Sequence, residues 1–267
     1  MKVRICLVIL SFCARSAYAS LESVDLGAAG AFAVLAGTTV TNTGATIVDG
    51  DLGVWAGTAI TGFPSGIVNG TVDASDASAM QAQTDLTTAY NYAAGQTCGT
   101  GNNLSGQDLG GLTLTPGVYC FGSSAQLTGT LTLDAQGEQN AVFIFQMGST
   151  LTTAAGSSVV FTDGGQGSDV FWQVGSSATL GTTTAFAGNI LALTSITLDT
   201  GANIQCGSAL AQNGAVTMDT NDVFGCDSGI TGTPEPGTAA LFGMALLLSL
   251  GGSWVKLHRR RACRSTP

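Results

Sequence analysis

The stretch Phe143-Ile-Phe-Gln-Met-Gly-Ser149 returns with small changes as Val170-Phe-Trp-Gln-Val-Gly-Ser176, 27 residues further along the chain (143 to 170). Such β-branched and aromatic residues suit pleated strands, and the closing Gly-Ser pair suits a corner. Other short runs of Thr, Val, Leu and Phe stand at 112–115, 130–133 and 196–198. This loose repetition predicts an all-β solenoid whose coils vary in length. A β-sandwich is the competing interpretation, because short strands separated by turns fit it as well.

One segment departs from this pattern. Between Asp73 and Gly95 the chain is rich in Ala and contains neither Gly nor Pro, and Asp73 or Ser75 is a suitable N-cap. The segment predicts one amphipathic helix over about 73–95. A helix of about 20 residues is roughly 30 Å long and would flank about six stacked β-coils.

The charged residues are distributed very unevenly. All 8 Lys and Arg residues and the single His lie within residues 2–15 and 256–264, whereas the 17 acidic residues lie between Glu22 and Glu235. A central region without cations cannot neutralise phosphates, which excludes nucleic acid as a partner. Without His, Lys or Arg it also lacks the groups of Ser-His-Asp catalysis, most zinc sites and phosphoryl transfer. Carboxylate chemistry, calcium binding or no chemistry remain.

The N-terminal residues have the pattern of a signal peptide. Lys2 and Arg4 precede an apolar run from Ile5 to Phe12, and Ala17-Tyr-Ala19 is a small-x-small cleavage site. We expect residues 1–19 to be removed. A buried N-terminal helix is the alternative, but it fits so short a run between charges poorly.

The C-terminal residues combine three elements in a fixed order. Pro234-Glu235-Pro236 is followed by an apolar stretch from Thr238 to Val255 and then by a basic tail at 256–264. This order resembles the PEP-CTERM sorting signal of bacterial surface proteins, and the resemblance implies an exosortase-type membrane protease that cuts near the motif. A permanent transmembrane anchor is the alternative. We expect one domain at 20–233, secreted or held at the cell surface, and a sorting tail at 234–267.

Four cysteines remain between the two ends: Cys98, Cys120, Cys206 and Cys226. Four cysteines allow three pairings, among which the sequence alone cannot choose. We favour Cys98 with Cys120 and Cys206 with Cys226, because each pair closes a short loop. Export to an oxidising compartment favours disulfides over thiols.

Two possible sites of chemistry have simpler explanations. Gly164–Phe171 fits the calcium-binding nonapeptide pattern, but those sites form between turns of a tandem array and this copy stands alone. The pairs Asp49/Asp51 and Asp73/Asp76 suggest the two carboxylates of a glycosidase, yet proximity in sequence is not opposition across a substrate. We therefore expect no metal, no cofactor and no enzyme activity.

Threonine is the more informative signal. Thr43-Gly-Ala-Thr46, Thr58-Ala-Ile-Thr61 and Thr200-Gly-Ala-Asn203 share the pattern Thr-Ala/Gly-x-Thr/Asn. On stacked β-coils such residues form a grid of methyl and hydroxyl groups, about 6.7 Å apart along a strand and about 4.8 Å apart between coils, which can order a layer of water. The plainer interpretation is that these threonines are β-formers on a solvated face.

Longer phrases across about Asp25 to Cys226 resemble the DUF3494 family of ice-binding (antifreeze) proteins. They include Thr39-Val-Thr-Asn-Thr-Gly44, Gly50-Asp-Leu-Gly53 and Leu114-Thr-Pro-Gly-Val-Tyr119, with further matches at 26–35, 57–64, 108–111, 171–175 and 214–217. The resemblance implies a right-handed, discontinuous β-solenoid of triangular cross-section, with a flanking α-helix and a capping subregion at about 96–120. Its N-terminal coils would stack beside its C-terminal coil.

That arrangement would bring the three Thr motifs onto one surface, which predicts six ice-contacting residues: Thr43, Thr46, Thr58, Thr61, Thr200 and Asn203. Thr41 and Thr182 are further candidates. The resemblance implies a monomeric protein that adsorbs to ice without turnover and inhibits its growth or recrystallisation. The chain has Gly207-Ser208 where the family pattern leads us to expect Gly-Arg. The alternative function is a cell-surface adhesin or matrix protein that binds polysaccharide.

The first testable prediction concerns the mature N-terminus. When the full chain is expressed in a bacterium that secretes it, the exported protein should begin at Ser20, because the peptidase site ends at Ala19. N-terminal sequencing and intact mass measure this directly. An exported chain that keeps residues 1–19 would contradict the assignment.

Overall fold

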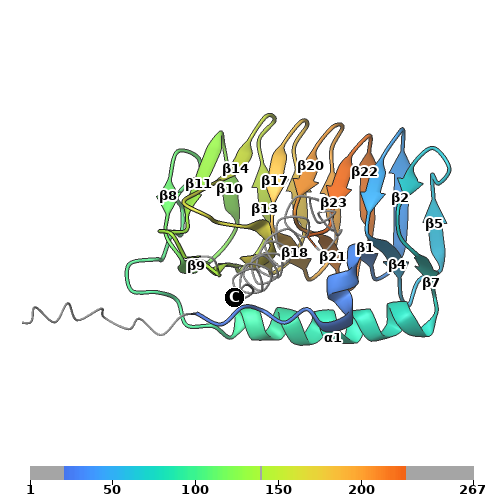
Figure 1. Ribbon diagram of the computed structural model, residues 1–267, viewed down its shortest axis with the longest axis horizontal. Coiled ribbons are helices and arrows are strands. Elements are labelled where there is room, and N and C mark those ends of the chain that lie inside the picture. Colours follow the sequence, from blue (N-terminus) through green and yellow to red (C-terminus); the bar gives the residue numbers. More distant parts are fainter. Residues whose placement is uncertain (1–20, 139, 227–267) are drawn as a thin grey trace, which may run out of the picture. The chain divides into compact units, whose positions relative to one another are not determined.

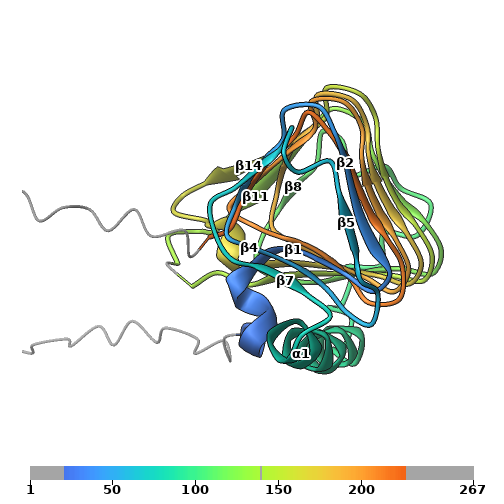
Figure 2. The same cartoon turned by 90° about the vertical axis from the view of Figure 1, so that its right-hand side faces the viewer.

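The computed structural model describes residues 21–138 and 140–226, which belong to one compact unit. The chain winds in right-handed coils whose three sides are three parallel β-sheets, so the cross-section is a triangle (Figure 2). Because every strand pairing is parallel, the sandwich interpretation is wrong and the solenoid is confirmed.

Each sheet takes one strand from each coil. Sheet A contains, in spatial order, β7 (Val72–Ala74), β4 (Asp51–Val54), β1 (Phe32–Ala36), β21 (Ala209–Ala211), β18 (Asn189–Ala192), β15 (Val170–Val174), β12 (Phe143–Met147) and β9 (Gly117–Phe121). Sheet B contains β10 (Ala125–Leu127), β13 (Leu151–Thr153), β16 (Ala178–Leu180), β19 (Ile196–Leu198), β22 (Val216–Asp219), β2 (Thr39–Thr43) and β5 (Ala59–Thr61). Sheet C contains β6 (Ile67–Val68), β3 (Ile47–Asp49), β23 (Asp222–Phe224), β20 (Asn203–Gln205), β17 (Ala185–Ala187), β14 (Ser158–Thr162), β11 (Thr130–Asp134) and β8 (Thr113–Leu114). Two short 3-10 helices, η1 (Gly27–Ala31) and η2 (Gly167–Asp169), complete the elements together with helix α1 (Ala77–Ala94).

The order of the coils in space differs from their order in sequence. The first coil, β1 to β3, pairs with the last coil, β21 to β23, on all three sides. We call this contact the junction. Helix α1 then carries the chain along sheet A to the far end of the stack, where β8 and β9 begin the remaining coils (Figure 1). The discontinuous arrangement is thus confirmed.

The helix begins later than the sequence predicted. Residues 72–74 pair with β4 as the last strand of sheet A, so the chain is still extended at Asp73. Asp76 is the N-cap, and its carboxylate accepts a 2.9 Å hydrogen bond from the amide of Ala79. Neither Asp73 nor Ser75 caps the helix, because strand pairing takes precedence over the local capping preference.

Sheet A is buried on both faces. Its inward side chains join the solenoid core, where Trp172 stacks on Phe145 with ring centroids 4.1 Å apart and lies tilted against Phe186 at 4.9 Å. Its outward side chains, among them Phe171 and Leu210, pack against Leu86 and the alanines of α1. This double coverage explains why the strands of sheet A are continuously apolar rather than alternating.

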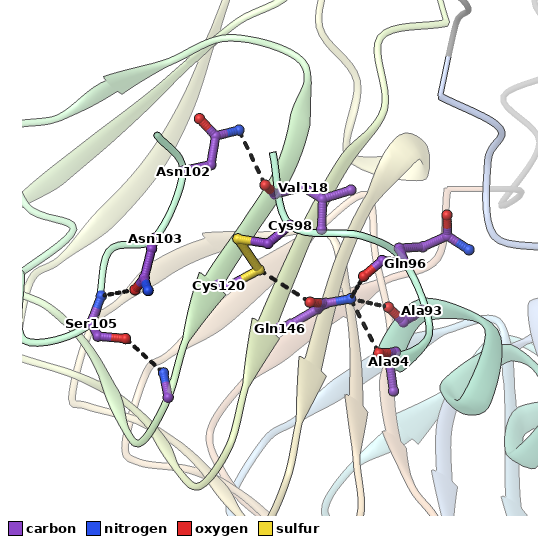
Figure 3. The surroundings of a disulfide bond; sticks show 11 residues. Ala93, Ala94, Gln96, Cys98, Asn102, Asn103, Ser105, Val118, Cys120 and Gln146 are labelled. Carbon is purple, nitrogen blue, oxygen red and sulfur yellow. Dashed lines mark hydrogen bonds between the residues drawn. A yellow bond between two sulfur atoms is a disulfide. The ribbon is translucent and has the colours of Figure 1, made fainter. Parts of the chain in front are cut away.

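The cap closes the end of the stack at β8 to β10. Residues 103 and 108 form isolated parallel bridges to Cys120 and Gln126, which extends the coil pattern into the cap. The side-chain amide of Gln146 donates to the carbonyls of Ala93 and Gln96 at 2.7 Å each, and so satisfies the end of α1 (Figure 3). The irregular part of the cap ends near residue 112, earlier than the predicted 120, because residues 117–121 form β9.

Both favoured disulfides are present. Cys98 and Cys120 join the cap to sheet A with a Cα–Cα distance of 5.9 Å (Figure 3), and Cys206 and Cys226 join the last two coils with a Cα–Cα distance of 4.1 Å. The predicted signal peptide at 1–19 and the predicted sorting tail at 234–267 lie outside the described residues. Within the described ranges, no helix is both long and apolar enough to cross a membrane.

The stacked rings of the core give a prediction about stability. Trp172 is fully buried and its indole N–H donates to the carbonyl of Ala187 at 3.0 Å. Trp172→Ala should lower the free energy of unfolding by about 3–5 kcal/mol, because it leaves a cavity and removes the hydrogen bond of the indole. Denaturant unfolding followed by circular dichroism measures the change.

A matched control is Val160→Ala, which truncates a side chain that points outward from sheet C and is 39 % exposed. It should change stability by less than about 0.5 kcal/mol. Equal effects of the two substitutions would mean that the aromatic stack does not hold the coils together.

Candidate functional site

The outward side chains of sheet B form one continuous ladder. Consecutive pairings place the following residues side by side, in spatial order: Gln126, Thr152, Thr179, Thr197, Thr217, Thr41 and Thr61. We call the six threonines the threonine ladder. Each is flanked in its strand by inward-facing residues, because side chains alternate along a strand. Neighbouring members therefore lie about 4.8 Å apart, the spacing of paired strands.

The ladder crosses the junction without a break. Thr217 of β22 pairs with Thr41 of β2, although 176 residues separate them in sequence (217 minus 41). Sheet B forms the side of the triangle that carries the labels β2 and β5 in Figure 2. The six threonines thus form an in-register row on an outer face of the molecule.

The ladder hydroxyls are available to solvent. Of the six, only Thr61 has a side-chain hydrogen bond to another described residue, a 3.5 Å contact with the carbonyl of Val40. Thr41, Thr61, Thr152 and Thr217 are exposed, and Thr179 and Thr197 are partly exposed. Because β-branched side chains are restricted at χ1, the methyl and hydroxyl groups of each threonine have few alternative orientations.

Differences in coil length are kept away from sheet B. The ladder positions are 27, 18 and 20 residues apart along the chain (152 to 179, 179 to 197, 197 to 217). The longest coil has a loop at 163–169 between sheets C and A, where the next coil has only Gly188. Insertions therefore enlarge another corner of the triangle and leave the ladder in register.

The other two sheets offer no comparable surface. Helix α1 and its apolar cluster cover sheet A. The outward row of sheet C mixes residue types, and runs through Ile47, Asp222, Asn203, Ala185, Ser158 and Thr130. Sheet B is therefore the face on which one side chain repeats on successive coils.

The residues predicted from the Thr motifs are divided between surfaces. Thr61 belongs to the ladder, Thr43 follows Thr41 on the same face, and Thr58 is exposed immediately before β5. Thr41, a further candidate, is a ladder member. Thr182 is exposed in the turn after β16.

Thr200 and Asn203 lie elsewhere. Thr200 is exposed at the corner between sheets B and C, where its hydroxyl donates to the carboxylate of Asp219. Asn203 opens β20 in sheet C, and its side-chain oxygen accepts a 2.9 Å hydrogen bond from the amide of Asp222. The structure does not bring these two side chains into the threonine ladder.

Thr46 is a correction to the predicted set. Its side chain is fully buried, its hydroxyl donates to the side chain of Asn42, and it accepts a 3.1 Å hydrogen bond from the amide of Asn221. A buried residue cannot contact a crystal surface. The reason is that the motif spans a corner. Thr43 ends β2 in sheet B, whereas Thr46 lies beyond the bend at 44–45, immediately before β3 of sheet C, with its side chain buried.

Sequence reasoning missed four ladder members: Thr152, Thr179, Thr197 and Thr217. For Thr179, Thr197 and Thr217 the signal is a threonine between two apolar residues, as in Ile196-Thr197-Leu198 and Val216-Thr217-Met218, whereas Thr152 is followed by a second threonine. Such a segment is too short to establish alternation by itself. Their common register becomes visible only when the coils are stacked.

The acidic pairs have structural roles. Asp51 accepts a 2.7 Å hydrogen bond from the amide of Thr71, and Asp76 caps α1. Burial raises the pKa of Asp73 above its ordinary value, a hydrogen bond from Thr71 opposes the rise, and the nearby charges of Asp76 and Asp51 add to it. In the part of the chain that the structure describes, no group of His, Cys, Asp or Glu residues is arranged to hold a metal ion.

Known proteins resemble this chain in both sequence and fold. A profile of the family described as ice-binding-like matches residues 34–224. An ice-binding protein from Nostoc sp. (strain HG1) is 60 % identical over 223 residues, which cover 83 % of this chain and 82 % of the relative. The crystal structure of an ice-binding protein from an Antarctic biological consortium is 50 % identical, with a TM-score of 0.74 over 78 % of this chain and 93 % of that one.

A second solved structure, of an ice-binding protein from the Antarctic ascomycete Antarctomyces psychrotrophicus, is 42 % identical. Its TM-score is 0.73, and the match covers 76 % of this chain and 98 % of the other. The family match spans the first coil, the helix, the cap and the last coil, including all six members of the threonine ladder. The chain therefore belongs to the ice-binding-like family.

Proposed function

We propose that this protein binds ice through the outward face of sheet B and thereby inhibits ice growth or recrystallisation. The observation that carries the proposal is the threonine ladder: six in-register threonines on one outer face, with hydroxyls largely free of protein partners. Relatives named as ice-binding proteins, one of them 60 % identical, support the same function.

The proposed mechanism needs no chemical turnover. The methyl groups of the ladder restrict how nearby water can orient, and the hydroxyl groups hold water by hydrogen bonds. Because the threonines are held in fixed rotamers on a rigid scaffold, little conformational entropy is lost when the ordered water merges with the crystal. Adsorbed molecules then force the ice front to curve between them, which stops its advance. The protein acts as a monomer without a cofactor in this mechanism.

The proposal also includes export of the protein and its sorting to the cell surface by the two ends of the chain. Residues 1–19 direct export, and Pro234-Glu235-Pro236 with the apolar stretch after it directs the protein to a membrane sorting protease and the cell surface. The two disulfides suit this destination, because disulfides persist in oxidising compartments. The ice-binding face would thus meet ice outside the cell.

The direct test is to grow single ice crystals in a solution of residues 20–233 under a cooled microscope. Faceted crystals whose growth stops are the expected result. Thr217→Tyr should abolish most of this activity, because a large ring in the middle of the ladder holds the face away from the crystal. Residue 217 is exposed, so the fold should be retained.

The matched control is Thr130→Tyr, which places the same ring on the outward row of sheet C, again at an exposed position. It should leave crystal shaping unchanged. Loss of activity in the control alone would move the ice-binding face to sheet C, and round, freely growing crystals with the unmodified protein would reject ice binding.

Thr46 provides a separate prediction. Thr46→Val removes a hydroxyl that two buried groups use, and should lower the free energy of unfolding by about 1–3 kcal/mol. The folded variant should still shape ice crystals near the freezing point of the solution, because Thr46 does not reach the surface. Thermal unfolding and crystal shaping measure the two effects. If Thr46 contacted ice, the variant would show the reverse result: ice crystals would no longer be shaped, and the free energy of unfolding would be unchanged.

A further inference from the structure

The available hydroxyls of sheet B are confined to one row. Two residues before each ladder position, the same face carries a second row next to the corner with sheet A, formed by Ser124, Thr150, Ser177, Ser195, Ala215, Thr39 and Ala59. Side chains of this preceding row lie about 6.7 Å from the ladder, the distance between alternate residues of a strand. Two complete rows would present a two-dimensional lattice to ice.

The preceding row does not complete that lattice, because four of its five hydroxyls, all except that of Thr39, take part in hydrogen bonds within the protein. Thr150 donates to the hydroxyl of Ser124 at 2.8 Å. Ser177 accepts a 3.3 Å hydrogen bond from the amide of Ser195, and Ser195 accepts one of 3.2 Å from the amide of Ala215. The row is also interrupted by Ala215 and Ala59, which carry no hydroxyl.

The row on the other side of the ladder is irregular. Two residues after the ladder positions stand Thr128, Ala154, Gly181, Asp199, Asp219, Thr43 and Phe63. The carboxylate of Asp219 already accepts hydrogen bonds from the hydroxyls of Thr200 and Thr220. Regularly spaced hydroxyls without protein partners therefore repeat from coil to coil along the threonine ladder. They do not repeat along the direction of a single strand.

From this arrangement we infer that the protein matches ice in one direction only, along the a axis, and adsorbs to both the basal plane and the primary prism plane. The inference rests on the proposed function. The spacing of about 4.8 Å between strands is close to the repeat of water molecules along the a axis of hexagonal ice. Rows of water in that direction lie in both planes. A second regular row would add a match along the c axis, which the prism plane has and the basal plane lacks.

The experiment is to grow a hemisphere of single-crystal ice in a solution of the fluorescently labelled domain, residues 20–233, and to record which planes take up the label. The domain has no lysine, so an amine-reactive dye attaches only at its N-terminus. The nearby Leu21 packs with the cluster between α1 and sheet A, away from sheet B. Label on both planes is the expected result.

Label on the prism plane alone, or on the basal plane alone, would overturn the one-directional match while leaving ice binding in place. Label on neither plane, with the domain folded, would overturn the proposed function and the inference with it. A domain that labels only planes without a row of water along the a axis would also overturn the inference.

Two substitutions on one coil sharpen the test. Thr197→Ala interrupts the middle of the ladder and should reduce the label on both planes several-fold and together. Ser195→Ala alters the preceding row of the same coil and should leave the labelled planes unchanged. Loss of the prism label alone in Ser195→Ala would show that the preceding row contributes a second direction, against the inference. Thermal unfolding of both variants checks that they are folded.

Discussion

The structure depends on the junction, where the first coil pairs with the last coil on all three sides of the triangle. Without this pairing, Thr41 and Thr61 would belong to a separate piece of the stack, and the row of threonines would end at Thr217. The junction is fixed by the alternation of side chains: a shift of one residue in β2 would turn Val40 outward and Thr41 into the core. Buried hydrogen bonds between Asn42, Thr46 and Asn221 join the same two coils from within.

The corner that leads into sheet B lets the coils approach closely. A Cβ atom at Gly148 would lie 2.8 Å from the carbonyl oxygen of Gly122, and one at Gly175 would lie 2.7 Å from that of Met147. Side chains at these positions would push successive coils apart, and strands in sheet B would lose their common spacing. Glycine at the corner and threonine on the face are therefore two parts of one requirement, a flat sheet with an even repeat.

The sequence predicts those parts of the structure whose residue pattern extends over many positions. The repeat of Phe143–Ser149 in Val170–Ser176 predicts stacked coils, and the long Ala-rich segment predicts the helix, because each pattern extends over several residues. The discontinuous order of coils followed from the family resemblance and not from periodicity.

The candidate site was predicted only in part. Thr43, Thr58 and Thr61 lie on or beside sheet B, whereas Thr46 is buried beyond the corner that follows β2, and the motif alone does not reveal that corner. The remaining ladder members lie in strands so short that the residue pattern of one strand does not show whether its threonine faces outward.

The helix that returns the chain along sheet A also sets a limit on how such a protein can evolve. Duplication of a middle coil would add one threonine to the row without altering the junction, where the first and last coils meet. Every added coil lengthens the stack by about 4.8 Å, so α1, now 18 residues long, would have to gain about three residues to span it. Gene duplication in the coils must therefore be matched by insertion in the helix. A longer threonine ladder is accessible only through two coordinated changes in distant parts of the gene.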